Sequence, residues 1–385
     1  MPNKTILTSR LSLLLITLIL SLKISAAENC KVQWGPAKMG SNENCQINQK
    51  ATSEPSSIIL KGFNWKYRQK SLALKIKVAN IHLMSGLKLS FYDRGQLKAT
   101  YTLPLYTDPE YNLLTEGQET ILSIPVSSLK WEGNASQTLN TDAQFNTLSI
   151  YLATDKEGQQ TLSLNILKTL YLDRPAKGKI SITFDDGYQS NLTAASIMAP
   201  LKLAGTAYII PKAIDKKGHL SSKDLSQIKK WGWSISAHLT TPVTQIKNLP
   251  QVLKETKAQI MQRGNSASAE HFALPLGKYD AETLEILKKY FKSVRLAGGH
   301  AETLPVQDHY RLKTINVTQA MPPEEVFEWC KKSILNKEWA ILMFHYLDQP
   351  EKGELNYSSK NYKKLMNLLK PYAQYVKTVE QVLSQ

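Results

Sequence analysis

The two halves of the chain follow different hydrophobic patterns. From about residue 55 to residue 172, apolar and polar residues alternate with a period of two. The runs that show this alternation most clearly are 72–78, 87–91, 122–126, 148–152 and 162–166. Turn residues separate the runs, and no long helical pattern interrupts them. Several short, half-buried strands in succession indicate an all-β sandwich.

After residue 178, strand patterns alternate with helical patterns. The expected strands are 180–184, 206–210, 233–237, 270–274, 293–297 and 339–346. The expected helices are 194–204, 222–231, 251–263, 281–291, 323–336 and a last one that begins after Ser358. Such repetition predicts an α/β domain, either a parallel barrel or a doubly wound sheet.

The first 27 residues have the features of an export signal. Lys4 and Arg10 precede an apolar run over 11–22, and a small-residue cleavage site follows at 25–27. The apolar run is short for a membrane span. An uncleaved anchor is the alternative. We therefore expect an exported protein, located in the periplasm or outside the cell.

Cysteine content and charge agree with export. Cys30 and Cys45 flank a short polar loop and could form a disulfide, while Cys330 falls in a helical pattern and reads as a buried thiol. The formal net charge is +16. A basic exported protein tends to associate with anionic envelope polymers or lipid head groups, the latter only peripherally. Nucleic acid is disfavoured, because no nucleic-acid motif is present.

Candidate catalytic residues lie at the ends of expected strands. Asp185 and Asp186 end the apolar run 180–184 and are followed by Gly187. His238 and His345 follow two further expected strands. In an α/β barrel, the carboxyl ends of the strands carry the chemistry. An ordinary Asp-Gly turn with two structural histidines is the simpler alternative. Two acids and two histidines at one rim favour a metal site combined with acid–base catalysis.

These motifs resemble those of the polysaccharide deacetylase family, carbohydrate esterases with a NodB-homology domain. The matching segments are 183–187 (TFDDG), 238–242 (HLTTP), 273–277 (ALPLG) and 342–345 (LMFH). The resemblance covers about 178–375. It implies a distorted (β/α)7 barrel and metal-assisted removal of N-acetyl or O-acetyl groups from sugars. The preceding half resembles, more loosely, the jelly-roll β-sandwich of carbohydrate-binding modules.

The resemblance also implies residue roles. Asp185 would be the general base and His345 the general acid. Asp186 and His238 would bind a divalent metal, with zinc the expected ion.

Two further residues complete the expected site. The backbone N–H of Leu276 would face the oxyanion, and Tyr188 would contact substrate.

Two positions depart from the family pattern. Pro242 stands where the family has a second metal histidine, and Ala273 stands where it usually has an arginine. No acidic residue near 294–302 clearly matches the one that orients the late histidine. The remaining histidines of the catalytic half are His219, His271, His300 and His309.

The sequence leaves three functional readings open. The first is a metal-dependent deacetylase of an acetylated envelope or extracellular polysaccharide. The second is a non-catalytic carbohydrate-binding protein with a degenerate metal site. The third is an envelope interaction protein that uses its basic surface. The expected organisation is a signal peptide (1–27), a carbohydrate-binding-like β-sandwich (28–176) and a deacetylase barrel (177–385).

Overall fold

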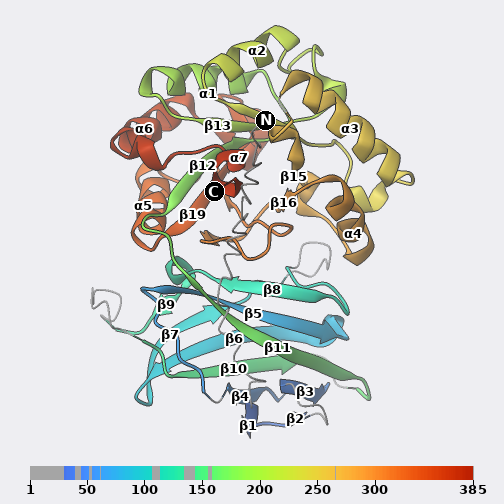
Figure 1. Cartoon of the computed structure of the whole chain (residues 1–385), viewed down its shortest axis with the longest axis vertical. Coiled ribbons are helices and arrows are strands. Elements are labelled where there is room, and N and C mark those ends of the chain that lie inside the picture. Colours follow the sequence, from blue (N-terminus) through green and yellow to red (C-terminus); the bar gives the residue numbers. More distant parts are fainter. Residues whose placement is uncertain are drawn as a thin grey trace, which may run out of the picture.

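The computed structural model divides into a β-rich half and an α/β half, which lie one below the other in Figure 1. The described residues are 30–39, 45–51, 54–60, 62–105, 113–133, 144–154, 158–264 and 266–384. The expected signal peptide lies outside them. Within these ranges, no helix has both the length and the apolar character needed to cross a bilayer.

The N-terminal half contains two antiparallel sheets. The six-stranded sheet has the order β1-β4-β10-β6-β7-β9 and the other has the order β2-β3-β11-β5-β8. The strands of the first are Cys30–Trp34, Ser56–Leu60, Thr147–Thr154, Met84–Asp93, Gln96–Thr102 and Lys130–Trp131. The strands of the second are Lys38–Met39, Cys45–Lys50, Thr161–Asp173, Lys70–Ala79 and Glu119–Ile124.

Alternating apolar residues from both sheets form a single core. Leu72 and Leu74 of β5 and Leu89 and Phe91 of β6 are almost completely buried in it. Trp65 is also fully buried, and its ring packs against that of Phe91 with centroids 5.3 Å apart. The period-two pattern therefore turns one face of each sheet inward.

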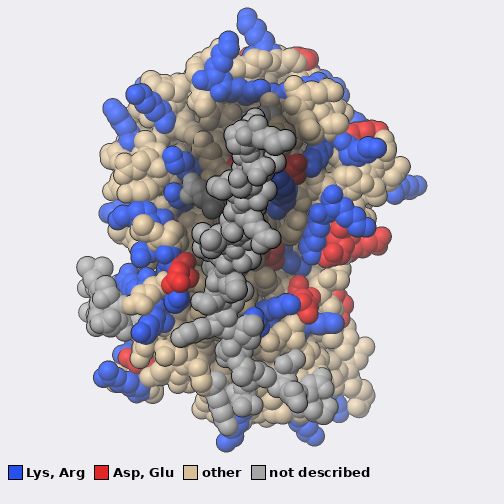
Figure 2. Space-filling model, viewed as in Figure 1, with Lys and Arg blue, Asp and Glu red and all other residues tan. Residues whose placement is uncertain are grey.

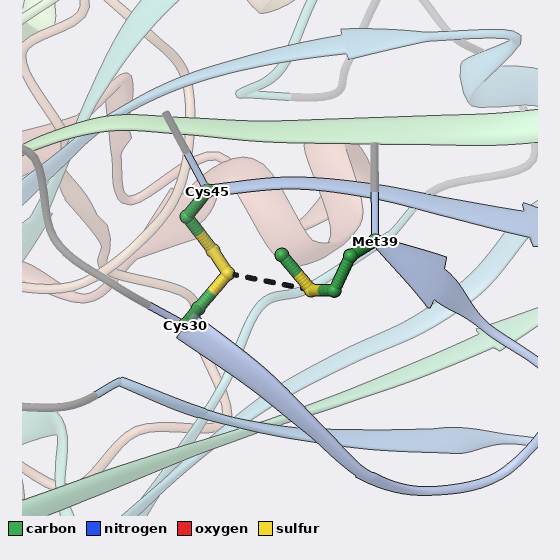
Figure 3. The surroundings of a disulfide bond; sticks show 3 residues. All are labelled: Cys30, Met39 and Cys45. Carbon is green, nitrogen blue, oxygen red and sulfur yellow. Dashed lines mark hydrogen bonds between the residues drawn. A yellow bond between two sulfur atoms is a disulfide. The ribbon is translucent and has the colours of Figure 1, made fainter. Parts of the chain in front are cut away.

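A disulfide joins the first and third strands. Cys30 of β1 is bonded to Cys45 of β3, and the sulfur of Met39 lies 3.8 Å from Cys30 Sγ (Figure 3). The two cysteines belong to different sheets, so the bond ties the two sheets together. Cys330 is a buried free thiol.

The C-terminal half is built on a mainly parallel sheet. Its order is β16-β15-β14-β13-β12-β19-β17, with β18 also paired to β19. These strands are Ser293–Arg295, His271–Ala273, Ser234–Ala237, Gly205–Ile209, Lys179–Phe184, Glu338–Phe344, Glu302–Thr303 and Ile315–Asn316. The α-helices are α1 Ser190–Met198, α2 Ser222–Lys230, α3 Leu249–Arg263, α4 Ala281–Tyr290, α5 Pro323–Leu335, α6 Ser359–Leu369 and α7 Val379–Leu383. Most of them surround the strands in Figure 1.

The segment 309–317 connects the two ends of this sheet. The N–H groups of Val294 and Leu296 donate to the carbonyls of His309 and Leu312 on one side. On the other side, β18 pairs in parallel with β19. Hydrogen bonds thus pass from β16 through this segment to β19.

One helix differs from its expected position. A helix was expected over 194–204, but α1 covers Ser190–Met198 and a 3-10 turn follows at Ala199–Leu201. Pro200 explains the early end, because proline has no N–H to continue the helical hydrogen bonds. The helix begins at Ser190, two residues after Tyr188 of the Asp-Asp-Gly-Tyr segment.

Buried charged groups join the two halves. The carboxylate of Glu338 accepts hydrogen bonds from the backbone N–H groups of Val126 and Ser127 at 2.5 and 3.3 Å. Ser123 of β8 donates to Glu302 at 2.6 Å and accepts from Lys313 Nζ at the same distance. These carboxylates are at most 2% exposed, and Arg174 and Lys313 also lie 3.5 Å from Glu338 and Glu302 respectively. Each carboxylate therefore has both a cationic partner and hydrogen bonds from the N-terminal half.

Candidate active site

The carboxyl end of β12 places two acidic side chains at the sheet rim. The N–H of Asp185 donates to the carbonyl of Phe344 at 3.0 Å, which extends the β12–β19 pairing by one residue. Asp186 then adopts a left-handed backbone conformation with φ 67°. Gly187 follows at φ 77°, and a Cβ there would lie 2.8 Å from Ile209 Cδ1. Glycine is therefore required at this turn.

Asp185 forms a buried ion pair with Arg295. Nη2 of Arg295 donates to both carboxylate oxygens of Asp185. The side chains are 0% and 4% exposed for Arg295 and Asp185 respectively. Nη1 donates to the Leu296 carbonyl at 3.0 Å, and the guanidinium carbon lies 4.9 Å from the Tyr208 ring centroid. Contacts on several sides fix the guanidinium, which in turn fixes the carboxylate.

Sequence reasoning did not assign a role to Arg295. It noted that Ala273 of β15 lacks the arginine that the family usually has near the base. The structure supplies an arginine from the neighbouring strand β16 instead. A signal was present, because Arg295 stands between the apolar residues Val294 and Leu296 in an expected buried strand. A charge in such a place requires a partner.

Asp186 and His238 face each other. His238 Nε2 lies 3.2 Å from Asp186 Oδ1, and Nδ1 lies 2.8 Å from the carbonyl of Ala273. A carbonyl only accepts, so Nδ1 carries a hydrogen and Nε2 points toward the carboxylate. Burial lowers the pKa of His238, but the hydrogen bond to Asp186 and the negative charges of Asp185 and Asp186 together raise this pKa overall. A proton or a metal cation between His238 Nε2 and Asp186 Oδ1 would interact favourably with both atoms.

His345 follows β19 and approaches Asp185. Its Nε2 lies 3.9 Å from Asp185 Oδ2. Nδ1 is buried and has no hydrogen-bond partner in the described part of the chain. Burial lowers the pKa of His345, against the opposing effect of the two aspartates. The ring is therefore a ready proton donor once it is protonated.

Aromatic rings support the site on the side of Asp186. The rings of Tyr188 and Tyr346 stack with centroids 3.9 Å apart, and the His219 ring lies 5.1 Å from that of Tyr188. Burial raises the pKa of Tyr188, and hydrogen bonds with Tyr346 and Asp186 add to this effect. Tyr188 therefore contacts the predicted metal ligand Asp186.

The predicted oxyanion residue lies in a turn after β15. Leu276 has φ 56° and its side chain is 62% exposed. Gly277, which follows, would place a Cβ 2.7 Å from Ala297 Cβ, so this turn packs tightly on the segment after β16.

The residues present satisfy only part of a metal site. Asp186 and His238 offer an oxygen and a nitrogen ligand on facing atoms, as zinc requires. The described residues contain no group of three or more His, Cys, Asp or Glu side chains that could hold a metal ion. Pro242 precedes the turn Val243–Gln245 and brings no ligand atom. A catalytic zinc normally has three protein ligands, so this set is incomplete.

The other histidines do not complete the set. His271 begins β15, at the end opposite to the rim, and its Nδ1 lies 2.9 Å from Ser293 Oγ. The His300 ring lies 6.1 Å from the Trp329 ring centroid. His219 lies nearest to the predicted ligands, through its contact with Tyr188.

Comparisons with known proteins match part of the C-terminal half. A family model described as polysaccharide deacetylase matches residues 173–291. A Bacillus subtilis (strain 168) protein named "Putative polysaccharide deacetylase YxkH" is 26% identical over 154 residues, which is 38% of this chain and 54% of that protein. The chain thus spans about half the length of this curated relative.

Solved structures with similar folds include two from Bacillus. The polysaccharide deacetylase BC0361 of Bacillus cereus has a TM-score of 0.38 at 11% identity, over 79% of this chain and 99% of that one. A family 4 carbohydrate esterase of Bacillus anthracis has a TM-score of 0.36 at 15% identity, over 54% and 83%. These TM-scores lie below 0.5, so the sequence match over 173–291 is the finding that bears on the family.

Proposed function

Residues 173–291 belong to the polysaccharide deacetylase family, and from this membership we propose that the protein hydrolyses N-acetyl groups of an envelope or extracellular polysaccharide. The observation that carries the proposal is the convergence of Asp185, Arg295 and His345 at one rim. A buried carboxylate held by a guanidinium and facing an imidazole is suited to moving protons.

Each residue has a defined part in the proposed hydrolysis. Asp185 accepts a proton from water, whose oxygen forms a bond to the acetyl carbon. The N–H of Leu276 donates to the oxyanion that develops on the carbonyl. His345 donates a proton to the nitrogen as the carbon–nitrogen bond breaks. Acetate and a free amino sugar result, with one water consumed.

The proposal includes a divalent metal ion, for which the described residues supply only two ligands. The family resemblance implies a divalent ion, zinc in the first place, which would polarise the carbonyl and the attacking water. Asp186 and His238 are the residues that would hold it. Because a third ligand is missing from the described residues, we expect weak binding and activity that rises when metal is added.

The wider organisation is also part of the proposal. An export signal (1–27) would precede a carbohydrate-binding-like β-sandwich (28–176) and a (β/α)7 barrel (177–385). The two antiparallel sheets that share one core support the β-sandwich. The hydrogen bonds through 309–317, which link β16 to β19, support the barrel. Lys and Arg side chains outnumber acidic ones on the face shown in Figure 2, which suits an anionic envelope.

A non-catalytic carbohydrate-binding role is the second candidate. The incomplete ligand set favours it, because a binding protein has no need of the metal. The ion pair between Asp185 and Arg295 disfavours it, since burying two charges costs free energy that binding alone does not require.

Acetate release from acetylated polymers tests the two candidates. The assay is run on a panel of polymers with and without added zinc or cobalt. Asp185→Asn and His345→Ala should each reduce the rate by about 100-fold or more, the contribution of a general base or acid. His309→Ala, which changes an exposed histidine, is the matched control. No acetate release under any metal condition would reject the enzymatic proposal in favour of binding.

A further inference from the structure

A cavity of about 240 Å³ lies between the two halves of the protein. Its N-terminal wall consists of Tyr101, Leu103, Pro104 and Leu113. Its C-terminal wall consists of residues that follow β15 and β16, Leu276–Gly277 and 296–300, together with Lys313. Both halves are therefore needed to form it. The volume equals that of about eight liquid water molecules.

The C-terminal wall includes Leu276 and residues that follow Arg295 along the chain. Leu276 is the proposed oxyanion residue, and its turn packs against Ala297. The Leu296 carbonyl accepts a hydrogen bond from Arg295, whose guanidinium holds the proposed base Asp185. The cavity thus begins one residue beyond the partner of the base.

The lining presents an apolar surface. Four leucines and a proline supply most of the side chains. The one cationic group of the described lining, Lys313, directs its ammonium to the carbonyl and hydroxyl of Ser123 at 3.0 and 2.6 Å. Its methylenes pack beside Gly299, where a Cβ would lie 2.9 Å from Lys313 Cβ. The charge is therefore satisfied away from the cavity.

We propose that this cavity receives the acyl chain of the substrate, and that the enzyme removes N-acyl groups longer than acetyl. The inference rests on the proposed function. When the substrate carbonyl lies at the Leu276 N–H, its alkyl substituent lies within reach of the adjoining apolar wall. Each methylene transferred from water to such a wall strengthens binding about fourfold. An acetyl group, with its single methyl, would leave most of the cavity unfilled.

A series of glucosamine oligomers that differ only in their N-acyl group tests the proposal. The acyl groups are acetyl, propionyl, butyryl and hexanoyl, and release of free amine is measured for each. We expect kcat/KM to rise about fourfold for each added methylene until the cavity is full. The increase in kcat/KM should depend on the acyl chain alone, since the sugar is the same in every substrate.

Two variants separate the cavity from general effects. Leu113→Trp fills the cavity from its N-terminal wall. It should lose the rise of kcat/KM with chain length. Leu97→Trp, on an exposed position of β7, is the matched control and should behave as the wild type. Leu103→Phe replaces Leu113→Trp if that variant does not fold.

Each outcome decides one of the two claims. Hydrolysis of acetyl with longer groups removed more slowly would overturn the acyl-chain inference and leave the deacetylase proposal in place. An unchanged rise with chain length in a folded cavity-filling variant would also overturn it. If no acyl group is released under any metal condition, the proposed function fails and the inference fails with it.

Discussion

Replacing Arg295 by methionine should destabilise the C-terminal half strongly. Methionine has a similar length but removes the guanidinium that faces Asp185. Both side chains of the pair are almost fully buried, so the carboxylate that remains has neither water nor an opposite charge. Breaking such a pair costs about 3–5 kcal/mol, against a total stability of about 5–15 kcal/mol.

This cost is large enough to measure by calorimetry. For a domain of about 150–250 residues, each kcal/mol lowers the melting temperature by about 2–4 °C, so we expect a decrease of roughly 6–20 °C. Arg263→Met is the matched control, because Arg263 lies at the partly exposed end of α3. Its melting temperature should remain within a few degrees of the wild type.

A double-mutant cycle tests the physical cause. Asp185→Asn removes the buried charge, so combining it with Arg295→Met should cost less than the sum of the two single changes. The difference should exceed about 1 kcal/mol, since residues in direct contact couple by about 0.5–3 kcal/mol. Additive effects, or a melting temperature of Arg295→Met close to that of Arg263→Met, would refute the reasoning.

Three further predictions concern the interface, pH and metal. A protein that begins at residue 174 should melt at a lower temperature than the whole chain, because Glu338 and Glu302 lose their N-terminal hydrogen bonds and keep only Arg174 and Lys313; an equal melting temperature would contradict this. Burial lowers the pKa of His271 to about 4, below its unfolded value, so stability present above pH 6.5 should fall by about 3 kcal/mol as the pH drops toward 4. Denaturant melts should show a smaller fall for His271→Gln than for the wild type, and an equal fall would exclude His271 as the cause. Pro242→His should raise zinc affinity in calorimetric titrations by supplying a third ligand, and an unchanged affinity would place the third ligand elsewhere.

The secondary structure of both halves was largely readable from the sequence. Period-two runs such as 72–78 and 148–152 lie in β5 and β10, and the capped run 222–231 contains α2. These patterns are local, because they depend on which side chains within a few residues share a face. The expected helix over 194–204 was misplaced because Pro200, inside the apolar run, ends the α-helix early.

The family and the strand-end position of the candidate residues were also readable from the sequence. Asp185, His238 and His345 each follow directly after a strand, as the apolar runs before them predicted. The family model described as polysaccharide deacetylase matches residues 173–291, in agreement with the resemblance of the motifs. Their catalytic roles stay predictions, because strand ends fix a position but not a reaction.

Only the tertiary structure decided which distant groups meet. Arg295 and Asp185 are 110 residues apart. The position of Arg295 in an expected buried strand indicates that it needs a partner, but it does not indicate that this partner is Asp185. The cavity likewise exists only where Tyr101, Leu103, Pro104 and Leu113 meet the turns after β15 and β16. Periodicity reflects whether each residue is buried or exposed. Pairing across such distances depends instead on the path of the whole chain and on the need of every buried charge for a partner.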